Sequence, residues 1–284
     1  MVDAAGFPYT RYVLQLPIIS DAMQYENLSV SRDGAIAIVT INRPEKANAL
    51  NYATLLELEH VALDFREDIE TRAVIFTGNG KHFSAGFDLT DPNAEYTGPL
   101  VLRRRRNRIG ARAIMALHDI DQITIAAWHG AAMGGGACIT TALDFRLGSP
   151  DCVMAYPEVD LGMNLMWQSL PLCVHLVGPA RAKRLVAGGE TVGAEQLLQW
   201  GMLDEIVARD ALLDRARALA EFYAAKPPVA VQMIKRSVNR IAGALDRSLM
   251  DMDADQNLLT RDSDDLAEAM RAYFAQDTPR FRGN

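Results

Sequence analysis

The sequence predicts an α/β fold in which parallel strands alternate with crossover helices, followed by a helical C-terminal region. Strand-like and helix-like stretches alternate through roughly the first 210 of the 284 residues, a pattern typical of parallel strands joined by helices. After Asp210 only amphipathic helical patterns remain. Hydrophobic residues make up 49% of the chain, which permits one large core and excludes extended disorder.

The expected strands are short apolar stretches between turn residues. The first, over 35–43, is rich in β-branched residues and lies between Asp33-Gly34 and Arg43-Pro44, as is typical of a strand. Further strands are expected at 72–80, at 123–130, twice within 145–158, and at 203–207.

The expected helices carry apolar residues at helical spacing. In the α/β part they are 48–68, 100–118, 134–145, 179–188 and 193–201, and after it 211–227, 228–243 and 249–274. We therefore divide the chain into an N-terminal extension (1–24), an α/β core (25–210) and a C-terminal helical region (211–284).

Charge and cysteine content narrow the function classes. The net charge of −7 does not favour a phosphate backbone, so no nucleic-acid partner is expected. The three cysteines have no metal-ligand spacing, so no metal is expected, and their odd number suits a reducing, cytoplasmic compartment. No signal-peptide pattern is present. The uncharged run 123–143 has the length of a membrane span, but its glycines and polar residues favour a buried crossing of the core, so no membrane partner is expected.

Three consecutive glycines, Gly134, Gly135 and Gly136, follow the expected strand 123–130 and begin a helix. The first amides of a helix have no intrahelical partner, and glycine lets a ligand approach them closely. Such a turn suits an oxygen that develops negative charge. A close contact between helix and strand would equally require small residues.

A second turn of small residues, within 78–89, also follows an apolar strand. Two such turns on adjacent parallel strands can direct two N–H groups at one oxygen, which favours an oxyanion hole. Neither turn matches a P-loop or a dinucleotide-binding GxGxxG motif.

Four stretches together resemble the crotonase superfamily, also called the enoyl-CoA hydratase/isomerase superfamily. They are 42–51, 83–89, 129–139 with 143–162, and the helical tail. The resemblance implies a crotonase-like spiral of ββα units with an α-helical C-terminal trimerisation region. It also implies an acyl-CoA thioester as substrate, no separate cofactor, and assembly as a homotrimer or as a hexamer made of two trimers.

The same resemblance implies roles for individual residues. The amides of Phe87 and Gly135 would hold the thioester oxygen, and Glu158 would transfer the proton. Asp144 resembles a position of structural type. The residues implied in CoA binding are Lys46, Ala47, Asn48, Ala49, Ala85, Asp88 and Leu89, and those implied in the substrate pocket are Met133, Cys138, Met163 and Trp167.

The chain departs from the family's hydratases at Cys138, where those enzymes carry a glutamate in addition to the one that resembles Glu158. Hydration uses both carboxylates, whereas a double-bond shift needs only one base that returns the proton elsewhere. The stretch 161–170 is also more similar to the isomerases. The sequence therefore favours a 3,2-enoyl-CoA isomerase-like reaction, in which Glu158 needs a pKa raised by an apolar pocket.

Other functions stay open. They are enoyl-CoA hydration; hydrolysis, dehalogenation or carbon–carbon cleavage of a CoA ester or of a β-diketone; and, in another class, a catalytically silent CoA-binding scaffold. Cys138 is expected to be a small core residue more than a nucleophile, and His129 is expected to be structural.

The arginine-rich run 103–108 is the strongest charge feature. The simplest interpretation is a solvated helix face. The alternatives are attraction of CoA phosphates, with Lys81 and Lys235 as further contacts, and a nucleic-acid patch.

Overall fold

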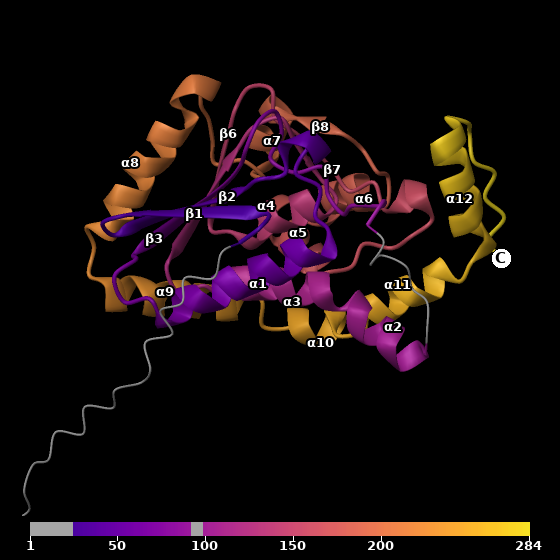
Figure 1. Cartoon of the computed structure of the whole chain (residues 1–284), viewed down its shortest axis with the longest axis horizontal. Helices are drawn as coiled ribbons and strands as arrows, with labels where there is room; N and C mark the ends of the chain where they lie inside the picture. The colour runs from indigo at the N-terminus through magenta and orange to yellow at the C-terminus, as the bar shows by residue number, and fades with distance from the viewer. Residues whose placement is uncertain (1–24, 92–98) are drawn as a thin grey trace, which may run out of the picture.

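The computed structural model describes residues 25–91 and 99–284, and its largest element is a six-stranded sheet (Figure 1). The strand order is β1-β2-β3-β4-β6-β9. β1 pairs antiparallel with β2, and the other neighbours are parallel, as the alternation of elements predicts. The strands are β1 (Leu28–Asp33), β2 (Ile36–Ile41), β3 (Ala73–Gly78), β4 (Ile123–Trp128), β6 (Phe145–Gly148) and β9 (Glu205–Ile206).

A smaller sheet has the order β5-β7-β8 and consists of β5 (Ala131–Met133), β7 (Val153–Ala155) and β8 (Val192–Gly193). Two of its strands directly follow strands of the large sheet, because the chain turns from β4 into β5 and from β6 into β7. Gly130, with φ +56°, makes the first of these turns, a conformation that favours glycine. A helix follows β5, which completes a unit of two strands and a helix.

Apolar side chains alternate between the two faces of the large sheet. On β2, Ile36 and Ile38 pack in a cluster with residues of the C-terminal helix α8, whereas Ala37 and Val39 pack in the main core with residues of α1. The alternating pattern explains how strands that are apolar throughout remain buried on both faces.

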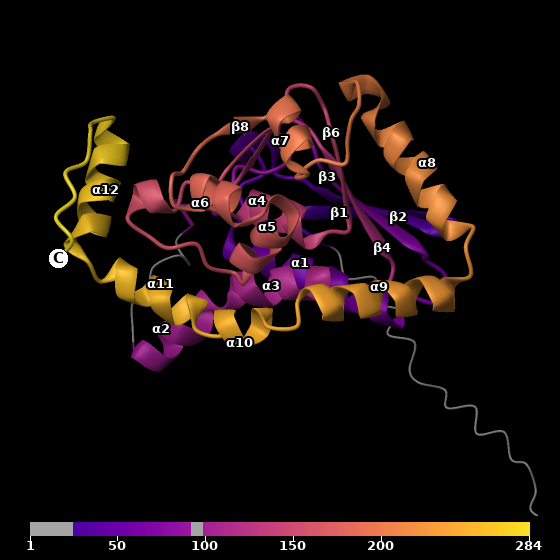
Figure 2. The ribbon, with the colours of Figure 1, turned by 180° about the vertical axis from the view of Figure 1, so that it is seen from behind.

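The helices surround these sheets (Figures 1 and 2). In the α/β part they are α1 (Tyr52–Glu67), α2 (Leu100–Asn107), α3 (Ile109–His118), α4 (Gly135–Ala142), α5 (Ser169–Val177), α6 (Pro179–Val186) and α7 (Ala194–Trp200), with short 3₁₀ turns η1 (Pro44–Lys46), η3 (Val159–Leu161) and η4 (Arg209–Ala211). The C-terminal helices are α8 (Leu212–Ala224), α9 (Pro228–Ala242), α10 (Asp246–Met250), α11 (Asp253–Arg261) and α12 (Asp264–Ala275).

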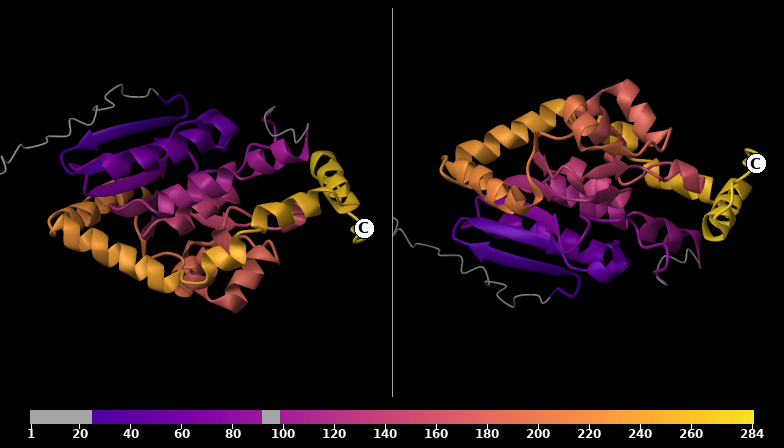
Figure 3. Two further views of the ribbon diagram at one scale, coloured as in Figure 1. Left: turned by 90° about the horizontal axis from the view of Figure 1, so that it is seen from below. Right: turned by 90° about the horizontal axis from the view of Figure 1, so that it is seen from above.

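The C-terminal helices extend along the side of the molecule opposite the first strands, coloured orange to yellow in Figure 3. α8 packs on the large sheet, and α12 lies at the far end of the molecule from α8 (Figure 1). Because α8 packs on the sheet of the α/β core, the predicted boundary at residue 210 between the core and the C-terminal helical region remains a prediction. The predicted extension 1–24 lies outside the described residues.

Several elements differ from the sequence expectations. β1, β5 and β8 were not expected, because β1 alternates apolar and polar residues at an edge and the other two are only three and two residues long. α5 was not expected either; its proline at the third position is tolerated in a first turn. The expected helix 100–118 is divided at Arg108, and 249–274 contains parts of three helices instead of one.

The uncharged run 123–143 forms β4, β5 and most of α4 within the core. Among the described residues, no helix has the length and apolar character that crossing a membrane requires.

Candidate active site

The first of the two small-residue turns lies beside the segment that follows η1. Leu50 donates its N–H to the carbonyl of Gly86 (2.7 Å) and accepts from the N–H of Asp88 (3.0 Å), so Leu50 and Phe87 form a parallel bridge. In such a bridge, the residue between the two that bond to the neighbouring strand has its own N–H on the far side, away from that strand. The N–H of Phe87 therefore faces away from Leu50, and among the described residues it has no hydrogen-bond partner.

The second turn places another N–H next to the first turn. Gly134 donates to the carbonyl of Ala155 (2.9 Å) and accepts from the N–H of Cys138 (2.9 Å), so its own backbone is satisfied. Gly135 begins α4, and within the described part of the chain its N–H has no partner. A Cβ built on Gly86 would lie 3.3 Å from this nitrogen, which shows that the two turns are in contact.

Glu158 follows the short strand β7 and lies beside the same glycines. A Cβ built on Gly134 would lie 2.8 Å from the Oε1 atom of Glu158, and Gly134 has φ +47°, so glycine supplies both the space and the conformation. The Oε2 atom is buried and has no hydrogen-bond partner among the described residues. Burial raises the pKa of Glu158 to about 7.

These three groups lie on one cavity of about 740 Å³. Its wall contains most residues that the sequence assigns to the site: Lys46, Ala49, Ala85, Phe87, Asp88, Leu89, Gly135, Cys138, Glu158, Met163 and Trp167. The wall also contains residues that sequence reasoning missed, of which the C-terminal ones are Asn257, Arg261, Ala269, Ala272, Tyr273, Phe274, Asp277, Pro279 and Phe281. The cavity is therefore closed by segments that are distant in sequence.

Ala47, Asn48 and Met133 are outside the cavity wall, although the sequence assigns them to the site. Asn48 is fully buried, and its side-chain amide donates to the carbonyls of Asn79 (2.8 Å) and His82 (2.7 Å). These hydrogen bonds hold the first small-residue turn in place. The carbonyl of Met133 lies against Gly86, so this residue supports the first turn.

Three further carboxylates lie on the cavity wall: Asp88, Asp160 and Asp277. The first is paired with Arg43 (3.1 Å) and the third with Arg271 (3.2 Å). The second extends toward Gly189, where a Cβ would lie 2.7 Å from its Oδ2 atom. Among the carboxylates of this wall, Glu158 is therefore the one that lies next to the two turns. Its Oε2 atom has no hydrogen-bond partner among the described residues.

Cys138 lies on the same wall as a protonated thiol. It is 1% exposed, and burial, with a smaller contribution from Glu158, raises its pKa well above the ordinary value. A thiol in this state is a poor nucleophile and a poor base at neutral pH.

Replacing Cys138 with alanine is therefore expected to leave catalysis within about threefold of the wild type, because a buried neutral thiol serves as a small core residue. The measurement is the rate of solvent-deuterium incorporation into an acyl-CoA thioester, the substrate that the resemblance implies. Loss of all incorporation, in a variant whose thermal unfolding is cooperative, would mean that the thiol takes part in the chemistry.

A charge effect on stability follows from the pKa of Glu158. The folded state binds this proton more tightly than the unfolded state, so the stability that the raised pKa of Glu158 contributes is lost as the pH rises from the ordinary value of 4.5 to about 7, above which the loss is constant. We expect Glu158→Gln to raise the free energy of unfolding by about 3 kcal/mol at pH 8 and by less than about 1 kcal/mol at pH 5. Urea unfolding at both pH values measures this. An equal change at both would contradict a charge effect.

One residue proposed as a phosphate contact, Lys235, and two residues expected to be structural, Asp144 and His129, have partners within the protein. Lys235 is buried, lies 2.6 Å from Asp144 and donates to the carbonyl of Gln122 (2.7 Å), so the expectation that it contacts a phosphate is corrected. Asp144 holds this lysine and accepts from the backbone of β4, in keeping with a structural type. His129 contacts the carbonyl of Gly80 (3.2 Å), in agreement with the structural expectation.

The arginine-rich run pairs with acidic residues in α11 and at its two ends. Arg103, Arg104 and Arg108 lie 3.1, 2.7 and 3.9 Å from Asp262, Asp255 and Asp251, respectively. Most of these side chains are partly solvated, which fits the helix-face interpretation and adds a connection to a helix of the cavity wall. Attraction of CoA phosphates by this run stays a prediction.

The geometry fits an enzyme site that stabilises an oxyanion and moves a proton next to it. Two unpartnered N–H groups from adjacent turns can bind one oxygen. The carboxyl of Glu158 beside them has a pKa at which it can both accept and release a proton at neutral pH. Within the described residues, no cluster of three His, Cys, Asp or Glu side chains could hold a metal ion.

Comparison with known proteins assigns the family. A model described as enoyl-CoA hydratase/isomerase matches residues 31–284. A short-chain-enoyl-CoA hydratase of Clostridium acetobutylicum is 33% identical over 219 residues, covering 77% of this chain and 83% of that protein. A carnitinyl-CoA dehydratase of Escherichia coli K12 is 34% identical over 217 residues, covering 74% and 79%. The chain belongs to the enoyl-CoA hydratase/isomerase family.

Solved structures agree on the fold. An enoyl-CoA hydratase/isomerase from Pseudoalteromonas atlantica has a TM-score of 0.79 at 27% identity, covering 90% of this chain and 100% of that one. Another from Xanthobacter autotrophicus has a TM-score of 0.81 at 26% identity, covering 88% and 94%. The predicted crotonase-like α/β fold with a helical C-terminal region is therefore confirmed.

Proposed function

We propose that the protein binds an acyl-CoA thioester and that Glu158 moves a proton on the acyl group. The N–H groups of Phe87 and Gly135 would hold the thioester oxygen as it gains charge. The observation that carries the proposal is the carboxyl of Glu158, which is buried, has no partner for Oε2 and lies against Gly134. A buried carboxyl oxygen without a partner is costly unless it serves a ligand.

The reaction that this arrangement favours is a shift of the double bond between the 3- and 2-positions of an enoyl-CoA. Ionised Glu158 removes a proton from the carbon next to the thioester carbonyl, and the electron pair delocalises onto the thioester oxygen. The two amides stabilise the resulting dienolate. The protonated carboxyl then returns the proton to the distal carbon, which requires one carboxylate.

Hydration or dehydration is the second candidate, favoured by the names of the two curated relatives, a hydratase and a dehydratase. Adding water needs a base for the water and an acid for the carbon, and family hydratases share this between two glutamates. Here the second position holds the neutral thiol of Cys138, so Glu158 would have to perform both roles.

A single pair of incubations distinguishes the candidates. The purified protein is mixed with a 3-enoyl-CoA or a trans-2-enoyl-CoA in deuterated water, and products are followed by mass spectrometry. Deuterium incorporation with double-bond movement supports isomerisation, and a product heavier by one water supports hydration. Free CoA would indicate hydrolysis, and binding without conversion would favour a silent CoA-binding scaffold.

We further propose that CoA lies along the segments 46–49 and 85–89, whose exposed cation Lys46 is at the cavity edge and suits a phosphate. No separate cofactor is required by proton transfer. The three cysteines are unpaired and buried, which fits a cytoplasmic enzyme.

A homotrimer, or a hexamer made of two trimers, is the assembly that we propose. One helix supports it: α9 exposes the apolar side chains of Val229, Met233, Ile234, Val238 and Ile241, a patch of the kind that marks a subunit interface. Light scattering of the purified protein measures the mass of the assembly.

A further inference from the structure

Trp167 lies on the cavity wall and has an unusual backbone conformation. Trp167 and Gln168 both have positive φ, +70° and +55°, and two such residues in succession are costly without glycine. The carboxylate of Asp253 on α11 accepts the N–H of Gln168 at 2.5 Å. The chain therefore holds this strained turn with a buried carboxylate from a distant helix.

The turn places the indole against two helices that have glycine at the contact. A Cβ built on Gly110 of α3 would lie 1.9 Å from Cε2, and one built on Gly135 of α4 would lie 2.3 Å from Cζ3. Neither glycine has positive φ, so their lack of a side chain serves to admit the ring.

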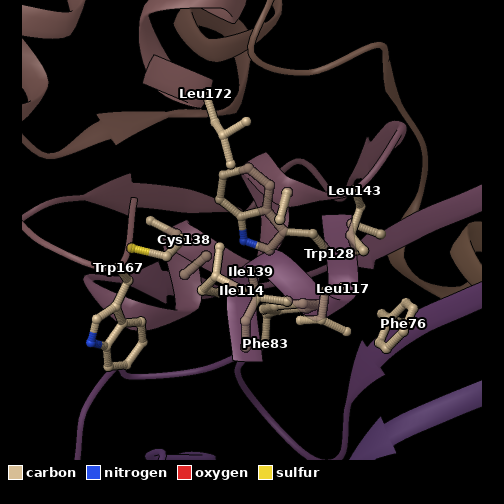
Figure 4. Packing of buried hydrophobic residues seen from close by; sticks show 14 of the residues in the cluster. Phe76, Phe83, Ile114, Leu117, Trp128, Cys138, Ile139, Leu143, Trp167 and Leu172 are labelled. Carbon is tan, nitrogen blue, oxygen red and sulfur yellow. The ribbon is translucent and has the colours of Figure 1, made fainter. Parts of the chain in front are cut away.

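The ring also borders the candidate reaction centre. The phenyl ring of Phe87 contacts the indole edge to face, with centroids 6.3 Å apart. Trp167 is 4% exposed, and Figure 4 shows it beside Cys138 at the border of the core cluster. Both residues whose amides face the cavity, Phe87 and Gly135, are thus in contact with this one side chain.

We propose that Trp167 closes the acyl end of the cavity and restricts the enzyme to short acyl chains. The inference rests on the proposed function, because it places the thioester oxygen at the amides of Phe87 and Gly135. A chain that extends inward from that carbonyl meets the indole and, behind it, the backbone of α3 and α4. Trp167 is therefore a specificity-determining residue, and Asp253 is a positioning residue for it.

Binding of unreactive ligands tests the inference separately from the chemistry. Dissociation constants are measured by calorimetry for saturated acyl-CoA thioesters with two to ten acyl carbons. Burying each added methylene should tighten binding about fourfold (about 0.8 kcal/mol) while space remains. For the wild type we expect this gain to stop or reverse within about six carbons. For Trp167→Ala we expect the gain in affinity to continue to acyl chains of about eight or ten carbons.

The matched control is Trp200→Ala. Trp200 is buried to a similar extent, 6% exposed, and packs beneath Arg181 and Arg184 away from the cavity wall. This variant should keep the wild-type dependence on chain length. Trp167→Phe, which retains an aromatic ring, should give an intermediate limit and serves if the alanine variant does not fold.

Each contrary result has a distinct meaning. Steady gains up to ten carbons in the wild type would overturn the inference and place the acyl tail along Met163 and α12. An unchanged limit in both Trp167 variants would overturn it as well. If no acyl-CoA binds at any length, the proposed function itself fails. If binding stops tightening at the expected acyl length but no deuterium is incorporated, the inference is supported and the proposed reaction is contradicted.

Discussion

Substitution of Glu158 by glutamine should lower the rate of proton transfer by about 10⁴-fold, near the upper end for loss of one acid–base group. The loss should be this large because Glu158 is the carboxylate of the cavity wall that lies at the two turns, and Cys138 is a neutral thiol. Glutamine has nearly the same shape, so acyl-CoA binding should change by less than about threefold. Deuterium incorporation measures the rate and calorimetry the binding.

Asp160→Asn is the matched control for this substitution. Asp160 is on the same cavity wall two residues later, but it extends toward Gly189, so its loss should leave the rate within about threefold. A wild-type rate in Glu158→Gln, or an equal loss in Asp160→Asn, would contradict the assignment of Glu158.

For the wild type, the rate of proton transfer should rise with pH through about 7, because the ionised carboxyl of Glu158 removes the proton.

Substitution of Gly86 by alanine should lower the rate by 10²- to 10³-fold, the usual effect of losing one oxyanion-hole donor. Gly86 has φ +89°, and an added Cβ would lie 2.6 Å from the carbonyl oxygen of Met133. The turn must shift, which moves the N–H of Phe87 away from the neighbouring N–H of Gly135. The turnover number should fall more than the ground-state affinity, since the amides act on charge that develops during the reaction.

Gly34→Ala separates this effect from the general cost of positive φ. Gly34 has φ +58° in the turn between β1 and β2, and nothing lies within 4 Å of an added Cβ. Both variants should lose stability, about 1 kcal/mol for an alanine forced to positive φ, but Gly34→Ala should keep the wild-type turnover number. Equal turnover in the two variants would argue against an oxyanion hole at Phe87.

The sequence predicts the parts of the site that depend on short segments. Small residues after β3 and after the expected strand 123–130 predict the two turns. In the structure the second turn follows β5, and the turns meet because Ser84 forms a parallel bridge with Ala132 of β5. The resemblance adds Glu158, and the structure places its carboxyl beside Gly134. The preference for one reaction over another remains a prediction, since the curated relatives are named as a hydratase and a dehydratase.

The missed parts depend on pairings between distant segments. Nothing near Lys235 in sequence indicates that its charge is satisfied by Asp144, 91 positions earlier, so it resembles an available cation. Tyr273 and Phe281 belong to the cavity wall because α12 packs against η3, more than a hundred positions after Glu158. Met133 was expected to face the cavity, but in β5 its backbone is used to support the first turn.

The contribution of α12 and the segment after it to the cavity wall has a consequence for protein synthesis. Glu158 and both turns emerge from the ribosome early, and α12 packs against η3, next to Glu158, only after more than a hundred further residues have been translated. A nascent chain that ends before Tyr273 would contain every group of the proposed chemistry without the wall that encloses the ligand. The cavity wall is therefore complete only after residues 273–281 have been translated, so an unfinished chain would lack part of the wall that we propose encloses acyl-CoA.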